Sequence, residues 1–235
     1  MNLKGTTKKG LACAGLGLLV NLLLCMDVLV LCLEMVFYKD AAANGMTVWQ
    51  YCLHFILVCT LWGLGSFAVY KLSKGKKLLP GTEHARKRFG ISGISILFLL
   101  VAAGILFMSF DAEEMRLHLK PLSELRYFLR TYGRAGISVF LLQHLYYLLE
   151  SALILFIIVF GQEAGESLFP VKRTSLIPWG GIFCALTWGM LHGLTKDWET
   201  ALFSLILSAF FVLCYFAANR RMFPAYLAIA LIFLL

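Results

Sequence analysis

The sequence predicts an all-α fold, a polytopic transmembrane helical bundle of about seven spans with one additional amphipathic helix at the membrane interface. Three observations predict it. Hydrophobic residues make up 60% of the 235 positions and charged residues only 14%, whereas soluble domains carry about 25% charged residues. The apolar residues form runs of about 20, the length that a helix needs to cross a bilayer core of about 30 Å. The short alternating segments of a membrane β-barrel do not occur in the sequence.

Short polar segments separate the apolar runs. The first run follows Lys4, Lys8 and Lys9 and is too long for the apolar part of a signal peptide, so we expect an uncleaved span. The predicted spans cover residues 11–37, 49–71, 89–110, 135–160, 176–193, 199–217 and 222–235. No polar stretch is long enough for a soluble module, so residues 1–235 are expected to form a single integral membrane domain.

Residues 111–133 mix charged and apolar side chains. Leu122, Leu125 and Leu129 fall on one helical face and the charges lie elsewhere, a pattern typical of a helix that lies in the membrane interface. Pro121 is expected to start or interrupt this helix, because proline has no backbone N–H to donate.

The net charge of +8 is concentrated in loops. Its largest cluster suits anionic lipid headgroups better than nucleic acid and consists of Lys71, Lys74, Lys76, Lys77, Arg86, Lys87 and Arg88. The distribution of lysine and arginine between alternate loops favours a cytoplasmic N-terminus. We expect the lipid bilayer as the first partner, no nucleic acid partner, and a plasma membrane location, bacterial in view of the short loops.

Seven cysteines lie in or beside the apolar runs, and no C-x-x-C pair occurs. Zinc-knuckle and thioredoxin-like sites are therefore not expected. Small apolar packing explains cysteines in such positions.

Ionisable residues inside a span are costly and are therefore candidates for function. Glu150 is the deepest, near the middle of the fourth span, and Gln143 and Tyr147 share its helical face. A buried general acid or base fits this stripe, and so does a protonated glutamate bonded to a neighbouring helix. Asp27 and Glu34 in the first span receive no role beyond pairing with basic groups of another span.

His192 ends the fifth span, and Trp188 lies one turn before it on the same face. Taken alone, such a histidine is more often interfacial than catalytic. Thr200, Ser204 and Ser208 recur every fourth residue in the sixth span. They could line a cavity, and they could also only permit close packing of helices, which we favour for this pattern.

The region 135–235 resembles the CAAX-protease and bacteriocin-processing family of intramembrane endopeptidases. The best match is Trp188-Gly189-Met190-Leu191-His192, which is similar to the family's Phe-x-x-x-His motif. The turn Arg220-Arg221-Met222-Phe223-Pro224-Ala225 looks like the family's entry into its last helix.

Two family motifs are incomplete in this sequence. The family's Glu-Glu-x-x-x-Arg motif is reduced to Glu150, with Leu155 or Ile154 where the arginine should be. The histidine and asparagine of the third motif fall on Ile229 and Phe233. Glu113 and Glu114 with His118 have a spacing similar to the first motif, but they lie in the amphipathic segment, where charged residues are normally solvated. We expect Glu163 and Glu166, which follow the fourth span, to be loop charges.

The resemblance implies an endopeptidase that acts on a membrane-associated peptide or protein tail. Glu150 and His192 would activate a water, and Gln143, Tyr147, Trp188, Ser204, Ser208, Ile229 and Phe233 would line the cavity. Two candidate ligands are fewer than the three of a catalytic zinc site, so no metal or other cofactor is expected. The incomplete motifs leave open an inactive relative that serves as a binding, immunity or accessory protein, and the buried acids leave open an unrelated transporter.

Overall fold

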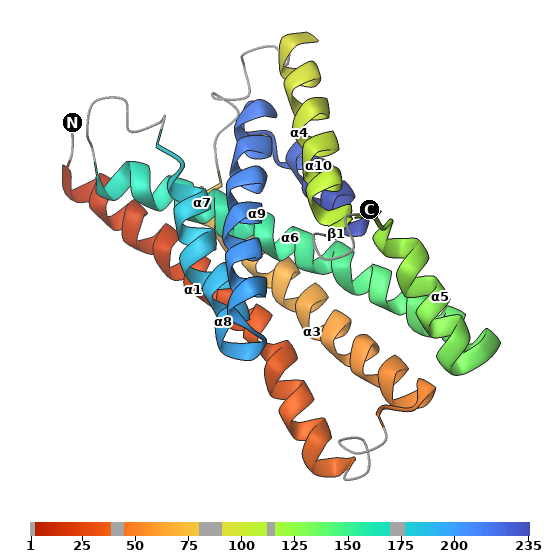
Figure 1. Cartoon of the computed structure of the whole chain (residues 1–235). Coiled ribbons are helices and arrows are strands. Elements are labelled where there is room, and N and C mark those ends of the chain that lie inside the picture. The colour runs from red at the N-terminus through yellow and green to blue at the C-terminus, as the bar shows by residue number, and fades with distance from the viewer. Residues whose placement is uncertain (1–2, 39–44, 80–90, 112–115, 170–176) are drawn as a thin grey trace.

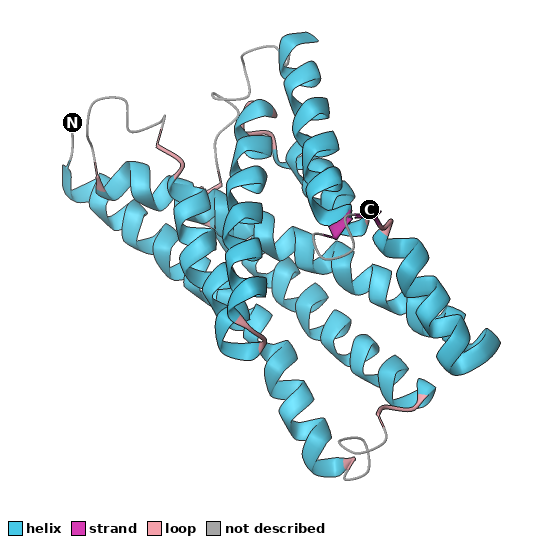
Figure 2. Cartoon of the chain, in the orientation of Figure 1, coloured by secondary structure: helices cyan, strands magenta, loops and turns pink. Residues whose placement is uncertain are grey.

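The computed structural model describes residues 3–38, 45–79, 91–111, 116–169 and 177–235. In this part of the chain nearly all residues are helical (Figure 2). The first half contains α1 (Leu3–Phe37), α3 (Val48–Gly75), α4 (Ile91–Ser109) and α5 (Lys120–Tyr132). The second half contains α6 (Gly136–Leu168), α7 (Trp179–Cys184), a π-helical segment (Ala185–Gly189), α8 (Met190–Thr195), α9 (Trp198–Ala217) and α10 (Met222–Leu234).

Five helical stretches among the described residues are long and apolar enough to cross a membrane. They contain α1, α3, α4, the α5–α6 region and α9. The all-α prediction is confirmed, but the count of seven spans is not. The predicted fifth span is divided between α7, the π-helical segment and α8, and α10 has only 13 residues.

Helix α6 forms the centre of the bundle. Figure 1 shows it running through the middle, with α1 and α3 on one side, α4 and α10 on the other, and α9 crossing it in this view. Every residue of its segment Glu150–Gly165 except Ala152 is buried. Apolar side chains with little or no exposed surface, among them Leu153, Ile157 and Phe160, fill the space between α6 and its neighbours.

Helix α6 continues beyond residue 160, where the sequence predicted the span to end, because its polar residues find partners. Glu163 pairs with Lys9 of α1 at 2.6 Å, and Glu166 accepts two hydrogen bonds from the Arg220 guanidinium. Gln162 accepts a hydrogen bond from the Gly180 backbone N–H at 3.0 Å. The prediction that Glu163 and Glu166 are loop charges is therefore wrong.

The segment 111–133 is only partly an amphipathic helix. Phe110–Asp111 pairs antiparallel with Arg116–Leu117, and helix α5 begins at Lys120 with Pro121 in its first turn, as proline favours. The predicted stripe faces outward at Leu122 and Leu129, which are exposed. Phe128 on another face is buried and packs against Tyr51 of α3.

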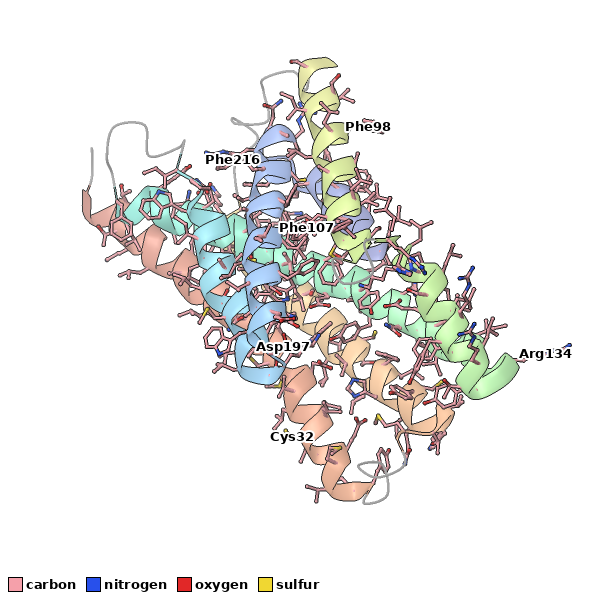
Figure 3. The ribbon with its side chains drawn as sticks, viewed as in Figure 1. Cys32, Phe98, Phe107, Arg134, Asp197 and Phe216 are labelled. Carbon is pink, nitrogen blue, oxygen red and sulfur yellow. The ribbon has the colours of Figure 1, made fainter. Side chains whose placement is uncertain are left out.

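Aromatic contacts show which face of α4 meets the bundle. Phe107 stacks on Phe203 of α9 with ring centroids 4.6 Å apart, whereas Phe98 points away from the neighbouring helices (Figure 3). Phe98 is 71% exposed. An outer surface of this kind suits contact with lipid.

The cysteines form no bridges, and four of the seven are packed in the interior. All seven are free thiols, and Cys13, Cys59, Cys184 and Cys214 are buried.

Candidate functional site

A cavity of about 340 Å³ lies where α1, α6, α8 and α9 come together, and α5 and α10 contribute one lining residue each, Lys120 and Phe233. Both candidate catalytic residues line it. The side chains that give the cavity its polarity are Asp27, Lys120, Tyr146, Tyr147, Glu150, Trp188, His192, Thr195, Lys196, Thr200 and Ser204.

Glu150 reaches the cavity from the middle of α6. Its side chain is almost fully buried, and its Oε1 accepts a hydrogen bond of 3.0 Å from the indole Nε1 of Trp188. A buried carboxyl group needs such a donor, because an unpaired polar atom away from water is costly.

His192 lies one turn after Trp188 and is held by the same residue. Its Nδ1 is 2.9 Å from the Trp188 carbonyl oxygen, and the two rings meet edge-on at 4.8 Å. The carbonyl only accepts hydrogen bonds, so Nδ1 must carry the proton. In the neutral imidazole Nε2 is therefore the acceptor that remains for a ligand or a water.

Trp188 thus bonds to both candidate catalytic residues, through its indole to Glu150 and through its backbone to His192. It belongs to the π-helical segment Ala185–Gly189. Single π-helical turns inside α-helices often mark functional sites, because they change the direction of the side chains that follow. Nothing in the sequence pattern indicated this turn.

Two lysines on the cavity wall were not among the residues selected from the sequence. The Lys120 ammonium donates to the Phe233 carbonyl oxygen at 3.1 Å and lies 3.8 Å from the centre of the Tyr147 ring. Lys196 follows α8 at the rim and is exposed. Lys120 was missed because its segment was interpreted as a solvated amphipathic helix, in which lysines are common.

Asp27 belongs to a chain of polar groups that crosses three helices. His54 of α3 places Nδ1 2.8 Å from Glu34 Oε2 and Nε2 3.2 Å from Asp27 Oδ1. The Tyr146 hydroxyl of α6 donates to Asp27 Oδ2 at 3.1 Å. The expectation that Asp27 and Glu34 pair with a basic group of another span is confirmed, and one histidine serves both.

Gln143 lies in a second cavity of about 560 Å³, beside α5 and the first half of α3. Its amide donates to Glu124 Oε1 at 3.1 Å, and the Tyr147 hydroxyl donates to the same oxygen at 2.8 Å. Tyr146, Tyr147 and Lys196 line both cavities, which are therefore neighbours. Gln143 was expected in the Glu150 cavity, but its bond to Glu124 turns it toward α5.

The remaining predicted lining residues divide into two groups. Tyr147, Trp188, Ser204 and Phe233 line the Glu150 cavity. Ser208 and Ile229 are fully buried in helix packing and are not among the described residues that line it. The hydroxyl of Ser208 donates to the Ser204 carbonyl oxygen of its own helix, so the close-packing interpretation fits Ser208 and the cavity interpretation fits Ser204.

Glu113 and Glu114 lie outside the described residues, as do Arg86, Lys87 and Arg88 of the basic cluster. Among the residues that the structure describes, no group of three or more histidine, cysteine, aspartate or glutamate side chains could hold a metal ion. No family model, no curated protein and no solved structure matches the chain.

Proposed function

We propose that this chain is an intramembrane endopeptidase similar to the CAAX-protease and bacteriocin-processing family, which cleaves a membrane-associated peptide or protein tail. One observation carries the proposal. Glu150 and His192, chosen as a pair from the resemblance, line one cavity and bond to the same residue, Trp188.

The chemistry requires a base, a water and room for a peptide bond. Glu150 accepts a proton from the water as the water oxygen adds to the carbonyl carbon, and Nε2 of His192 accepts the second hydrogen bond of that water and orients it. The C–N bond then breaks, and the proton on Glu150 goes to the leaving amine nitrogen. General base catalysis of this kind contributes about 10²–10⁴-fold to a rate.

The proposal includes the position in the membrane. The segment Trp179–Thr195 and helix α10 would complete seven spans, together with the five long apolar stretches. The Glu150 cavity would then lie within a bacterial plasma membrane, where a membrane-tethered substrate can reach it. The proposal keeps the N-terminus of α1 on the cytoplasmic side, as the distribution of lysine and arginine between alternate loops favours.

The test is a cleavage assay with the purified full chain in detergent. A panel of lipid-tethered peptides is incubated with the wild type, Glu150→Gln and His192→Ala. We expect cleavage by the wild type and a loss of about 10²-fold or more in each variant. Glu199→Gln is the matched control, since Glu199 is an exposed carboxylate in the first turn of α9. Cleavage that persists in Glu150→Gln would overturn the proposal.

A specific observation also favours a second candidate, a catalytically silent relative that binds such tails. The Trp188 indole occupies one oxygen of Glu150, and positions 229 and 233 offer no side-chain donor. A silent binding protein would cleave no peptide on the panel. It would bind a lipid-tethered peptide with equal affinity in the wild type and in Glu150→Gln.

A further inference from the structure

The third motif of the family ends on Phe233, whose side chain cannot donate a hydrogen bond. The structure places a donor beside it. Lys120 of α5 sends its ammonium to the Phe233 carbonyl oxygen at 3.1 Å and lies 5.1 Å from the centre of the Phe233 ring. A cation from another helix therefore lies beside the position that lacks a polar side chain.

The surroundings of Lys120 leave its charge available to a ligand. An ammonium group has three N–H donors, and the Phe233 carbonyl accepts one of them. The Tyr147 ring covers another side at 3.8 Å, a contact that holds a cation in place without neutralising it. The side chain is partly buried and lines the Glu150 cavity, within electrostatic reach of Glu150 and Glu124.

A hydrolytic site requires such a group. When water adds to a carbonyl carbon, the carbonyl oxygen becomes negative, and preorganised donors that meet this oxyanion lower the barrier. We infer that Lys120 is the oxyanion-stabilising residue of this cavity and recognises the anionic tetrahedral form of a peptide bond. The inference rests on the proposed function and deepens it.

The step balances without a further reactant. The water oxygen forms its bond to the carbonyl carbon, the carbonyl π-electrons move to the oxygen beside Lys120, and the proton goes to Glu150. On collapse the oxygen returns its electron pair, the C–N bond breaks, and the amine takes the proton from Glu150. Lys120 keeps all its protons throughout and acts by charge and hydrogen bonding.

A rival explanation is purely structural, since the Phe233 carbonyl belongs to the last turn of α10 and needs a donor. A capping lysine would affect stability and not the recognition of an anion. The two explanations therefore separate in a binding experiment. The matched control is Lys74→Met, which removes a lysine over the Tyr70 ring at 5.9 Å, on the exposed end of α3.

The experiment compares two ligands in the full chain, a lipidated dileucine peptide and its analogue with an anionic phosphonate in place of one amide. Binding is followed by tryptophan fluorescence, because Trp188 lines the cavity. The wild type and Lys74→Met should prefer the phosphonate. Lys120→Met should lose at least about tenfold of that preference with little change for the parent peptide, and Lys120→Arg should retain most of it. If Lys120→Met does not fold, Lys120→Gln, which keeps a donor but no charge, gives the same comparison.

A wild type without phosphonate preference, or an uncharged Lys120 variant that keeps it, overturns the assignment. The cleavage assay separates this failure from failure of the proposed function. If cleavage depends on Glu150 and Lys120→Met leaves kcat unchanged, the endopeptidase proposal is supported and the oxyanion role of Lys120 is rejected. If the phosphonate preference depends on Lys120 but no peptide is cleaved, the anion-binding role of Lys120 is supported and the protein is a catalytically inactive relative. If Lys120 is catalytic, kcat should fall by about 10²-fold or more with little change in KM.

Discussion

The indole Nε1 of Trp188 donates a 3.0 Å hydrogen bond to Oε1 of Glu150, and this bond joins α6 to the π-helical segment. Both side chains are buried. The bond therefore couples the stability of the bundle to the ionisable group that the proposed chemistry uses.

Replacing Trp188 by Phe keeps an aromatic ring and removes the donor. We expect the free energy of unfolding to fall by about 1–3 kcal/mol or more, because a buried Glu150 oxygen loses its partner. Denaturant unfolding in mixed micelles measures the change. In a Glu150→Leu background the same substitution should cost clearly less, and an equal cost in both backgrounds would show that the bond contributes nothing.

His54 is the basic group between two carboxylates, at 2.8 Å from Glu34 and 3.2 Å from Asp27. His54→Phe would leave both acids without this partner in the interior of the bundle. We expect a loss of about 3–5 kcal/mol, the usual cost of removing one member of a buried ion pair. Adding Glu34→Leu and Asp27→Leu to His54→Phe should restore much of the stability, and a triple variant less stable than His54→Phe would contradict the argument.

Two glycines give a matched test of helix contact. A Cβ on Gly180 would lie 2.3 Å from the backbone oxygen of Ile158, whereas a Cβ on Gly63 meets no atom within 4 Å. Gly180→Ala must push α7 away from α6, and we expect a loss of about 1–3 kcal/mol. Gly63→Ala should be neutral or stabilising by up to about 1 kcal/mol. The melting temperatures of the two variants, measured by thermal unfolding under the same conditions, test this prediction. Equal melting temperatures would show that α7 does not pack tightly against α6.

Asp197 caps the N-terminus of α9, at the turn between α8 and α9 (Figure 3), and its Oδ1 accepts the Thr200 backbone N–H at 2.7 Å. The hydrogen bond from the Thr200 backbone, with a second from the Thr200 hydroxyl, holds the pKa of Asp197 below its ordinary value of 3.8. A lowered pKa in the folded state means that the carboxylate stabilises the fold fully above the ordinary value. That contribution disappears as the pH falls through the lowered pKa.

Asp197→Ala should therefore lower the melting temperature at neutral pH, and the difference from the wild type should shrink in acid below the ordinary aspartate pKa. Asp197→Asn is the control, because asparagine also caps helices but does not titrate in this range. Melting curves from pH 2.5 to 7 make the comparison. A difference between Asp197→Ala and the wild type that does not change with pH would contradict this prediction.

Much of the fold could be predicted, because hydropathy and helix start signals are local. The apolar runs gave the long helices, and Pro121 marked the start of α5. The end of α6 could not be predicted, since Glu163 and Glu166 are polar in the sequence and become buried only through Lys9 and Arg220. A contact between residues 154 positions apart leaves no periodic signal.

Only part of the candidate site could be predicted from the sequence and from its resemblance to a known family. The resemblance joined His192 to Glu150, whose depth in a span had already singled it out, and both line one cavity. It also predicted that Ile229 lines this cavity, but Ile229 is buried in apolar packing. Lys120 was not selected, and His54 was given no role. Their importance depends on the helices that face them, and the spacing of residues along one helix says nothing about its neighbour.

The order of partners along the chain has a consequence for biogenesis. Glu34 precedes His54 by only 20 residues, so the acidic groups of α1 meet their base as soon as α3 leaves the ribosome. Under the proposed membrane topology, the two helices would enter the bilayer as one hairpin in which His54 already contacts both acids. Lys9 must wait for Glu163, which is synthesised 154 residues later, so this contact between α1 and α6 can form only after α6 has been made.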